Sequence, residues 1–211
     1  MQGRYEIREM RKAVAATKHG FDNILRKIPS SLGKPRSERM LEGAFNAISR
    51  EEGNEVGYDT IIASGAHAPI LHWMRNTGTV ESGELLLIDA GVEVNSLYTA
   101  DITRTFPTNG KFTDFQKKLY QAVLDSQQAG FEAAKPGATY SDIHHACMRV
   151  IAERLHDWVF CRSMSRSRSP LKASSIAVGS PAAWPTIWVS TCMIARRRVM
   201  SRIRTPRFVR A

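Results

Sequence analysis

Two aspartates in the middle of the chain, Asp89 and Asp101, are the residues best placed to do chemistry. Asp89 ends the apolar segment ELLLIDA, and Asp101 lies in the next β-like segment, LYTADITRTF. A turn centred on Asn95 would place the two aspartates directly opposite each other, with Cβ atoms about 4.5–5.5 Å apart. Two carboxylates at that separation repel each other unless a proton or a cation lies between them.

A metal ion is one answer to that repulsion. Hard divalent cations prefer oxygen ligands, and Mn²⁺ is a natural candidate. Two such ions, about 3.5–4 Å apart, could share the carboxylates. Burial of Asp89 after four apolar residues points the same way, because a buried carboxylate is costly unless it is paired, hydrogen-bonded or metal-bound. The simpler alternative is that each aspartate is a turn or capping residue at the end of a strand.

Two amphipathic helices are expected before the aspartates. The spacing of apolar residues predicts the first over residues 6–28, and the segment from Pro29 to Gly33 should end it. We expect Ser37 to be the N-cap of the second helix, which Gly53 ends. The expected apolar faces are Ile7, Met10, Val14, Phe21 and Leu25 in the first helix and Met40, Leu41, Ala44, Phe45 and Ile48 in the second.

Strands and further helices follow. The β-rich segments are residues 58–63, 84–90 and 97–106, with a turn over residues 92–95 and a loop that carries His67 and His72. Thr113 and Gln116 form a capping-box pattern before a helix that runs to about residue 134. Another helix should start at Ser141, with Ile143, Val150, Ile151 and Leu155 on its apolar face.

The net charge of +10 belongs to the end of the chain. Residues 161–211 contain 11 of the 30 basic residues and no acidic one, which leaves 19 basic against 20 acidic residues in residues 1–160. The tail is rich in Ser and Arg and lacks amphipathic periods, so we expect it to be disordered. We therefore predict a folded part over residues 1–159 and a basic tail over residues 160–211. No CxxC motif, signal peptide or membrane span is visible, which predicts a cytoplasmic protein.

The segment LLLIDAGVEVNSLYTADITRTFPTNGKFT resembles the metal-binding hairpin of aminopeptidase P and of its prolidase and creatinase relatives, which use D-A-G, a spacer and D-I-T-R-T-F-P. The upstream IIASGAHAPILHWMRN resembles the family segment that ends in L-H-Y/W. The resemblance covers residues 5–158. It implies the pita-bread α/β (α+β) fold, incomplete here, in which an antiparallel sheet with flanking helices holds two metal ions.

The resemblance also implies roles for particular residues. Asp89 and Asp101 match the two aspartate ligands, and His72 matches the histidine that contacts the substrate near the scissile bond. The implied enzyme is an Xaa-Pro aminopeptidase with two divalent ions, Mn²⁺ first and Co²⁺ or Zn²⁺ as alternatives. Its partner would be a peptide with proline at the second position, with no specific nucleic acid and no membrane, and the intact family can form homo-oligomers. His67, His144 and His145 match no family role.

The second half of the family's site is missing from the sequence. The family also needs a metal-binding His, a second catalytic His in an H-x-x-G-x-D-V-H-D segment and two later Glu ligands, and no such motif follows Asp101. Rereading residues 184–194 from the last base of each codon permits A-H-H-L-G-L-D-V-H-D, with the Gly and the final Asp forced. We therefore expect the tail to be a frameshifted translation that begins near Val159, and this polypeptide to be inactive.

Three other interpretations stay open at this point. The chain could derive from a prolidase-type dipeptidase, because the hairpin is shared with that group. It could be a non-catalytic polypeptide that binds nucleic acid through the Arg-rich tail, in which case binding would depend strongly on salt. The tail could also be a natural basic extension.

Overall fold

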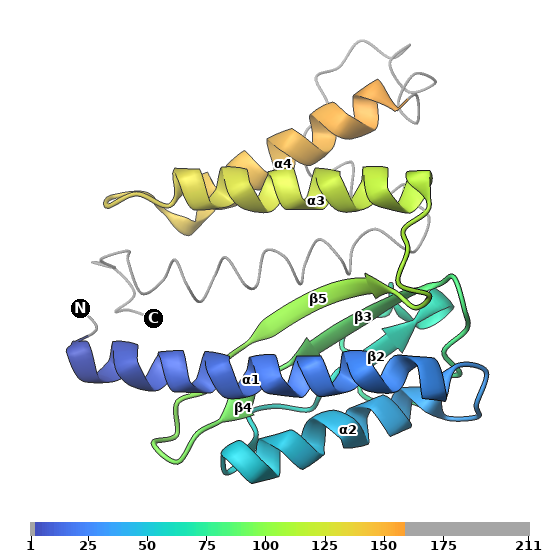
Figure 1. The fold of residues 1–211 in the computed structure, drawn as a ribbon. Coiled ribbons are helices and arrows are strands. Elements are labelled where there is room, and N and C mark those ends of the chain that lie inside the picture. Colours follow the sequence, from blue (N-terminus) through green and yellow to red (C-terminus); the bar gives the residue numbers. More distant parts are fainter. Residues whose placement is uncertain (1–2, 159–211) are drawn as a thin grey trace. The chain divides into compact units, whose positions relative to one another are not determined.

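A computed structural model describes residues 3–158 of the chain (Figure 1). The expected boundary at residue 159, the basic tail and the frameshift inferred from it lie outside the described residues. The described chain forms two compact units, one up to residue 112 and the other from residue 113. Within residues 3–158, no helix is both long enough and apolar enough to cross a membrane.

The first unit contains an antiparallel sheet. Strands β2 (Ile61–Ser64), β3 (Leu85–Ala90) and β5 (Ile102–Pro107) pair in the order β2-β3-β5. A short 3₁₀ helix, η1 (Gly65–His67), follows β2, and β1 (Glu55–Val56) pairs separately with β4 (Val92–Glu93). Antiparallel pairing with flanking helices confirms the expected fold class.

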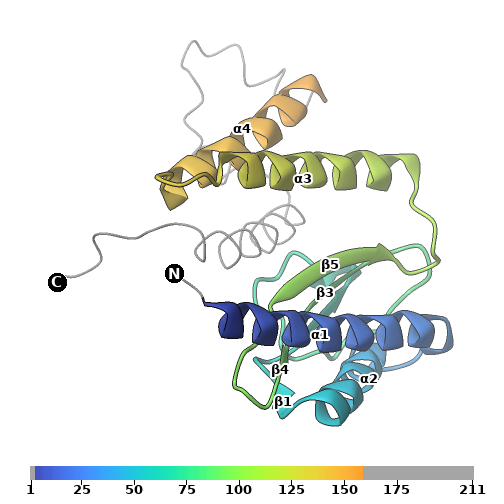
Figure 2. The same cartoon turned by 60° about the vertical axis from the view of Figure 1, so that its left-hand side comes forward.

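Helices α1 (Arg4–Ser31) and α2 (Ser37–Glu52) lie on the same side of these strands in both views (Figures 1 and 2). Because side chains alternate along a strand, Leu86, Ile88 and Ala90 of β3 point to the helices and join one buried cluster with them. Asp89 therefore points to the opposite face of the sheet, away from α1 and α2. That cluster includes Phe21, Ile24 and Ile28 of α1, Leu41 and Phe45 of α2, and Ile62, Val80 and Val92.

The first helix differs from its prediction in length. Pro29 lies inside α1, which continues to Ser31. A proline removes one backbone donor, here the N–H that would bond the carbonyl four residues earlier. The hydroxyls of Ser30 and Ser31 donate to the carbonyls of Lys27 (2.9 Å) and Ile28 (2.8 Å), which helps to satisfy the helix end.

The predicted apolar face of α1 was partly wrong. Ile7 and Leu25 are 42% and 38% exposed, whereas Ala13 and Thr17 are fully buried. Small residues bring the two helices close together: a Cβ added at Gly20 would lie 2.4 Å from the Phe45 ring. The buried face of α1 thus combines these small residues with the bulky Phe21, Ile24 and Ile28.

The start of α2 also differs. Arg36, with φ 56°, is the N-cap, and Ser37 is the first helical residue. The Ser37 hydroxyl accepts a hydrogen bond from the backbone N–H of Val80 at 2.6 Å, so it ties the helix to the chain that leads into β3. The expected end of the helix at Gly53 is confirmed.

The hairpin between β3 and β5 is shifted from the predicted register. Asp89 pairs with Thr103, not with Asp101, and β5 begins only at Ile102. The turn is centred on Ser96: the N–H of Val94 donates to the Tyr98 carbonyl, and Leu97 has φ 64°. A three-residue turn with a left-handed last residue is a common hairpin connection. This turn moves the pairing by two residues, which preserves the face on which each side chain lies.

The second unit is a helical hairpin of α3 (Asp114–Ala133) and α4 (Tyr140–Asp157). The capping box of Thr113 and Gln116 is confirmed. The second helix starts at Tyr140 instead of Ser141, because Thr139 and Asp142 form a capping box of their own. Only Ile143 of its four predicted apolar positions is buried, alongside Cys147.

Candidate metal centre

The two aspartates converge although they are not paired in the sheet. Asp89, at the end of β3, is only 7% exposed. Asp101 comes directly before β5, two residues before Thr103, which is the partner of Asp89. Because side chains two residues apart lie on the same face, Asp101 is diagonal to Asp89 on one face of the hairpin. The sequence thus predicted correctly that Asp89 and Asp101 lie close together on one face, but it predicted the wrong register between the two strands.

Tyr58 brings the two carboxylates together. Its hydroxyl oxygen lies 2.6 Å from Oδ1 of Asp89 and 3.1 Å from Oδ1 of Asp101. A phenol has one proton to donate, so at any instant it serves only one of the two oxygens. The carboxylates therefore share a single donor, and the negative charge of the pair is only partly compensated by it.

Burial shapes the protonation of this trio. Burial raises the pKa of Asp89, and the nearby charge of Asp101 raises it further, while the hydrogen bond from Tyr58 opposes the rise. The nearby Thr103 hydroxyl also lowers that pKa. Burial, followed by the two carboxylates, raises the pKa of Tyr58 far above its usual value, so this phenol stays a proton donor.

Gly91 leaves room for this arrangement. A Cβ at Gly91 would lie 1.8 Å from the Ala100 carbonyl oxygen and 3.1 Å from Cε1 of the Tyr58 ring. The returning chain and the tyrosine therefore approach the backbone at a point where only glycine fits. The glycine of the D-A-G motif is explained by this close approach.

Sequence reasoning missed Tyr58. It stands at the start of a segment that was assigned only as β-rich, and its partners are 31 and 43 residues away along the chain. The pairing of β2 with β3, in which Ile61 is opposite Asp89, brings the segment to the site. No local pattern in the sequence reports that pairing.

His72 lies in the loop between β2 and β3, where it is exposed and has φ 54°. A positive φ is uncommon for a residue other than glycine, although histidine adopts it more often than most residues. The side chain is close enough to Asp89 for its charge to lower the pKa of that carboxyl. His72 therefore lies within electrostatic range of Asp89.

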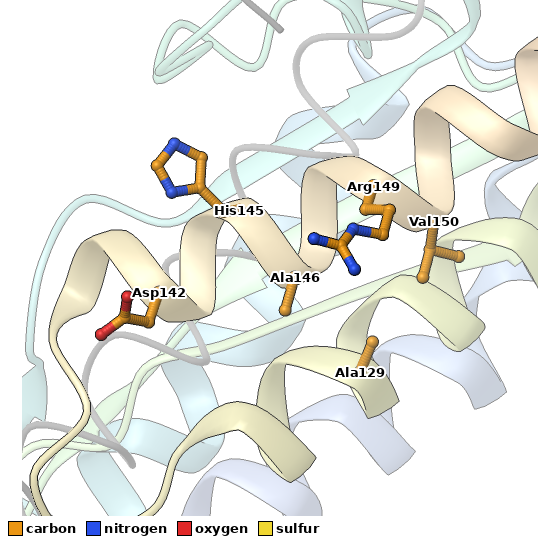
Figure 3. Close-up of a pocket in the computed structure, with 6 residues that line it drawn as sticks. All are labelled: Ala129, Asp142, His145, Ala146, Arg149 and Val150. Atoms are coloured by element: carbon orange, nitrogen blue, oxygen red, sulfur yellow. The ribbon is translucent and has the colours of Figure 1, made fainter.

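The remaining predicted histidines lie elsewhere. His67, which precedes His72 between β2 and β3, hydrogen-bonds Glu38 of α2 (2.9 Å). His144 and His145 sit side by side on α4, with ring centroids 5.9 Å apart. A surface hollow of about 550 Å³ on the α3–α4 hairpin is lined by Asp142, His145 and Arg149 among small residues, and these side chains point in different directions (Figure 3). It has no convergent polar groups, so we do not regard it as a site.

The donor set fits part of a metal centre. Two carboxylates around one hydroxyl offer the oxygen ligands that hard divalent cations prefer, and their repulsion would be relieved by a cation. Within residues 3–158, however, no group of three or more His, Cys, Asp or Glu side chains could hold a metal ion. The described residues therefore bring two carboxylates together, and a complete centre would need further donors.

Comparison with known proteins covers the part of the chain that contains this hairpin and these helices. Residues 8–168 match the model of metallopeptidase family M24. Xaa-Pro aminopeptidase 1 of Streptomyces coelicolor is 51% identical over 154 residues, which is 73% of this chain and 31% of that protein. Xaa-Pro aminopeptidase 2 of the same organism is 50% identical over 156 residues, which is 74% of this chain and 33% of that protein.

Solved structures agree with the sequence comparison. A substrate complex of a variant Escherichia coli aminopeptidase P matches with a TM-score of 0.67 and 29% identity, over 83% of this chain and 37% of that one. Pseudomonas aeruginosa aminopeptidase PepP matches with a TM-score of 0.67 and 30% identity, over the same shares. The chain spans about a third of the length of the curated relatives it matches. On its sequence and its fold, the chain belongs to metallopeptidase family M24 and carries part of the catalytic domain of an Xaa-Pro aminopeptidase homologue.

Proposed function

We propose that this chain supplies Asp89, Asp101 and His72 to the active site of a metal-dependent aminopeptidase that removes the residue before a proline at the second position. The observation that carries the proposal is the convergence of both carboxylates on the Tyr58 hydroxyl, at 2.6 and 3.1 Å. The names of the Streptomyces relatives support the choice of substrate.

In this proposal Asp89 and Asp101 hold two divalent ions, with Mn²⁺ as the preferred ion. The family is a metallopeptidase family, and a zinc-substituted form of Escherichia coli aminopeptidase P has been solved with product. When bound, such ions lower the pKa of a water molecule and polarise the scissile carbonyl. Tyr58 keeps the two carboxylates together by donating to them in turn.

His72 is proposed to contact the substrate. It is exposed on the loop that precedes β3 and lies within electrostatic range of Asp89. A histidine here can donate a hydrogen bond to a peptide carbonyl or accept one from an amide.

We further propose that this polypeptide has little or no peptidase activity by itself. Asp89 and Asp101 are only two of the five protein ligands that the family resemblance implies. With only those two, a divalent ion would stay largely hydrated and would bind weakly. The same polypeptide with its reading frame restored after Val159 should regain the remaining ligands and the activity.

Manganese binding tests the assignment of the ligands. Isothermal titration of the full chain with MnCl₂ should show weak binding that is lost in both Asp89→Asn and Asp101→Asn. Asp59→Asn is the matched control, since Asp59 is exposed and adjacent to Tyr58. Equal loss of binding in Asp59→Asn, or full binding in Asp89→Asn, would show that the ion is held elsewhere.

Peptide hydrolysis tests the reaction. The frame-restored protein with Mn²⁺ should cleave an Xaa-Pro-Xaa tripeptide after its first residue, and chelation should stop cleavage. Cleavage of Xaa-Pro dipeptides alone would indicate a prolidase-type enzyme instead. Metal-dependent cleavage by the unmodified chain would refute the claim that two ligands are insufficient.

A further inference from the structure

We propose that Glu38 is a positioning residue, whose buried carboxylate holds the loop of residues 64–78 and so fixes where His72 stands. The inference rests on the substrate contact proposed above for His72. Glu38 is the second residue of α2 and is 0% exposed. Both of its carboxylate oxygens are occupied entirely by donors from that loop.

Four hydrogen bonds join the carboxylate to the loop. Oε1 accepts from the backbone N–H of Ser64 (3.0 Å) and from Nδ1 of His67 (2.9 Å). Oε2 accepts from Nε1 of Trp73 (2.9 Å) and from the backbone N–H of Gly78 (2.7 Å). Two of the donors precede His72 in the chain and two follow it, so one carboxylate ties together both arms of the loop.

The two side-chain donors also contact each other. The rings of His67 and Trp73 are stacked, with centroids 3.9 Å apart and an interplanar angle of 23°. Because an ionised carboxylate only accepts hydrogen bonds, the proton of His67 must be on Nδ1. Trp73 is the residue directly after His72, so the stack and its bond to Glu38 restrict the backbone beside the proposed substrate contact.

A carboxylate suits this position for physical reasons. Four donors point at one buried group, and only an ionised carboxylate has enough acceptor sites without adding a proton of its own. The start of a helix also favours a negative charge. The site is closely packed, since a Cβ at Gly78 would lie 2.6 Å from Nδ1 of His67 and 2.7 Å from the Glu38 carboxylate.

Glutamine is the informative replacement. Glu38→Gln keeps the shape, but its amide N–H₂ would face two of the four donors, so at least two bonds are lost. Glu9→Gln is the matched control: Glu9 is also a buried glutamate on a helix, 5% exposed, and it bonds Ser96 rather than the loop. Neither variant touches Asp89, Asp101 or a metal ion.

Hydrogen exchange of the full chain, followed by mass spectrometry, gives the first readout. In Glu38→Gln, exchange in residues 64–78 should be about tenfold or more faster, because charge-assisted bonds that close the loop are lost. Exchange in β3 and β5 should stay within about twofold of wild type. Glu9→Gln should leave the loop unchanged. An equal acceleration across β3 and β5 would mean that Glu38 is only a general stability residue, and would overturn the proposal.

NMR of the labelled chain gives the second readout. The His72 ring signal, assigned by His72→Ala, should shift or broaden in Glu38→Gln and not in Glu9→Gln. Trp73→Phe, which removes one donor and leaves three, should cause a smaller change of the same kind and keeps the test open if Glu38→Gln does not fold. An unchanged His72 signal in both loop variants would refute the positioning role. These readouts use neither substrate nor metal, so they can succeed or fail independently of the peptidase assignment.

Discussion

Replacing Tyr58 with phenylalanine removes one hydroxyl from the point where the two carboxylates meet. The short 2.6 Å bond to Asp89 is lost, together with the 3.1 Å contact to Asp101. Because the phenol has a single proton, the loss should equal one hydrogen bond to a charged acceptor, and not two. That is about 1.5–3 kcal/mol of the free energy of unfolding, or roughly a ten- to hundredfold change in the unfolding equilibrium.

Urea unfolding of the full chain in EDTA measures this loss, provided that the m-value does not change. Tyr98→Phe is the control, because Tyr98 packs edge-on against Tyr5, 6.3 Å between centroids, away from the carboxylates. It should cost less than about 0.5 kcal/mol. Saturating Mn²⁺ should reduce the cost of Tyr58→Phe, since a cation then separates the carboxylates. If Tyr58→Phe and Tyr98→Phe are equally stable in EDTA, the Tyr58 hydroxyl does not stabilise the carboxylate pair as described.

Three further predictions follow from the same structure. Gly91→Ala should cost about 1–3 kcal/mol or more in urea unfolding, because its Cβ would lie 1.8 Å from the Ala100 carbonyl oxygen; a change below about 0.5 kcal/mol would contradict the close approach. The backbone N–H and the hydroxyl of Thr139 lower the pKa of Asp142 below its ordinary value of 3.8. The ionised Asp142 therefore stabilises α4 fully at a pH above its ordinary pKa, and this stabilisation is lost as the pH falls through the lowered pKa of the folded state. Helicity measured by circular dichroism should therefore fall less steeply with acid in Asp142→Asn than in the wild type. Sequencing the coding DNA across residues 158–161 should reveal an inserted or deleted base, and an intact frame that encodes the same tail in close relatives would exclude the frameshift.

Local patterns predicted many of the elements well. The strand over residues 84–90, the end of α2 at Gly53 and the capping box of Thr113 and Gln116 were all read from neighbouring residues. Such signals are short-range, because a cap or a strand-end carboxylate acts on residues within a few positions of itself. The same locality explains why the motif around Asp89 and Asp101 was recognised.

Predictions that depended on partners far along the chain were weaker. The buried face of α1 was partly misassigned, because it includes small residues such as Gly20, whose place is decided by its fit against the Phe45 ring. The prediction of Ser37 as an N-cap was wrong, because its hydroxyl instead accepts a hydrogen bond from the backbone N–H of Val80, 43 residues away. Neither contact leaves a periodic or spacing signal in the sequence.

The carboxylate pair shows the same division. The sequence by itself determined that Asp89 and Asp101 lie on one face of a hairpin, since side chains alternate with a period of two. It also determined the family, through the residues around that pair. Only the tertiary structure decided the register, which follows from the turn centred on Ser96. It alone brought Tyr58 to the pair and Glu38 to the loop of His72, because those contacts depend on the packing of segments about 30 residues or more apart in the chain.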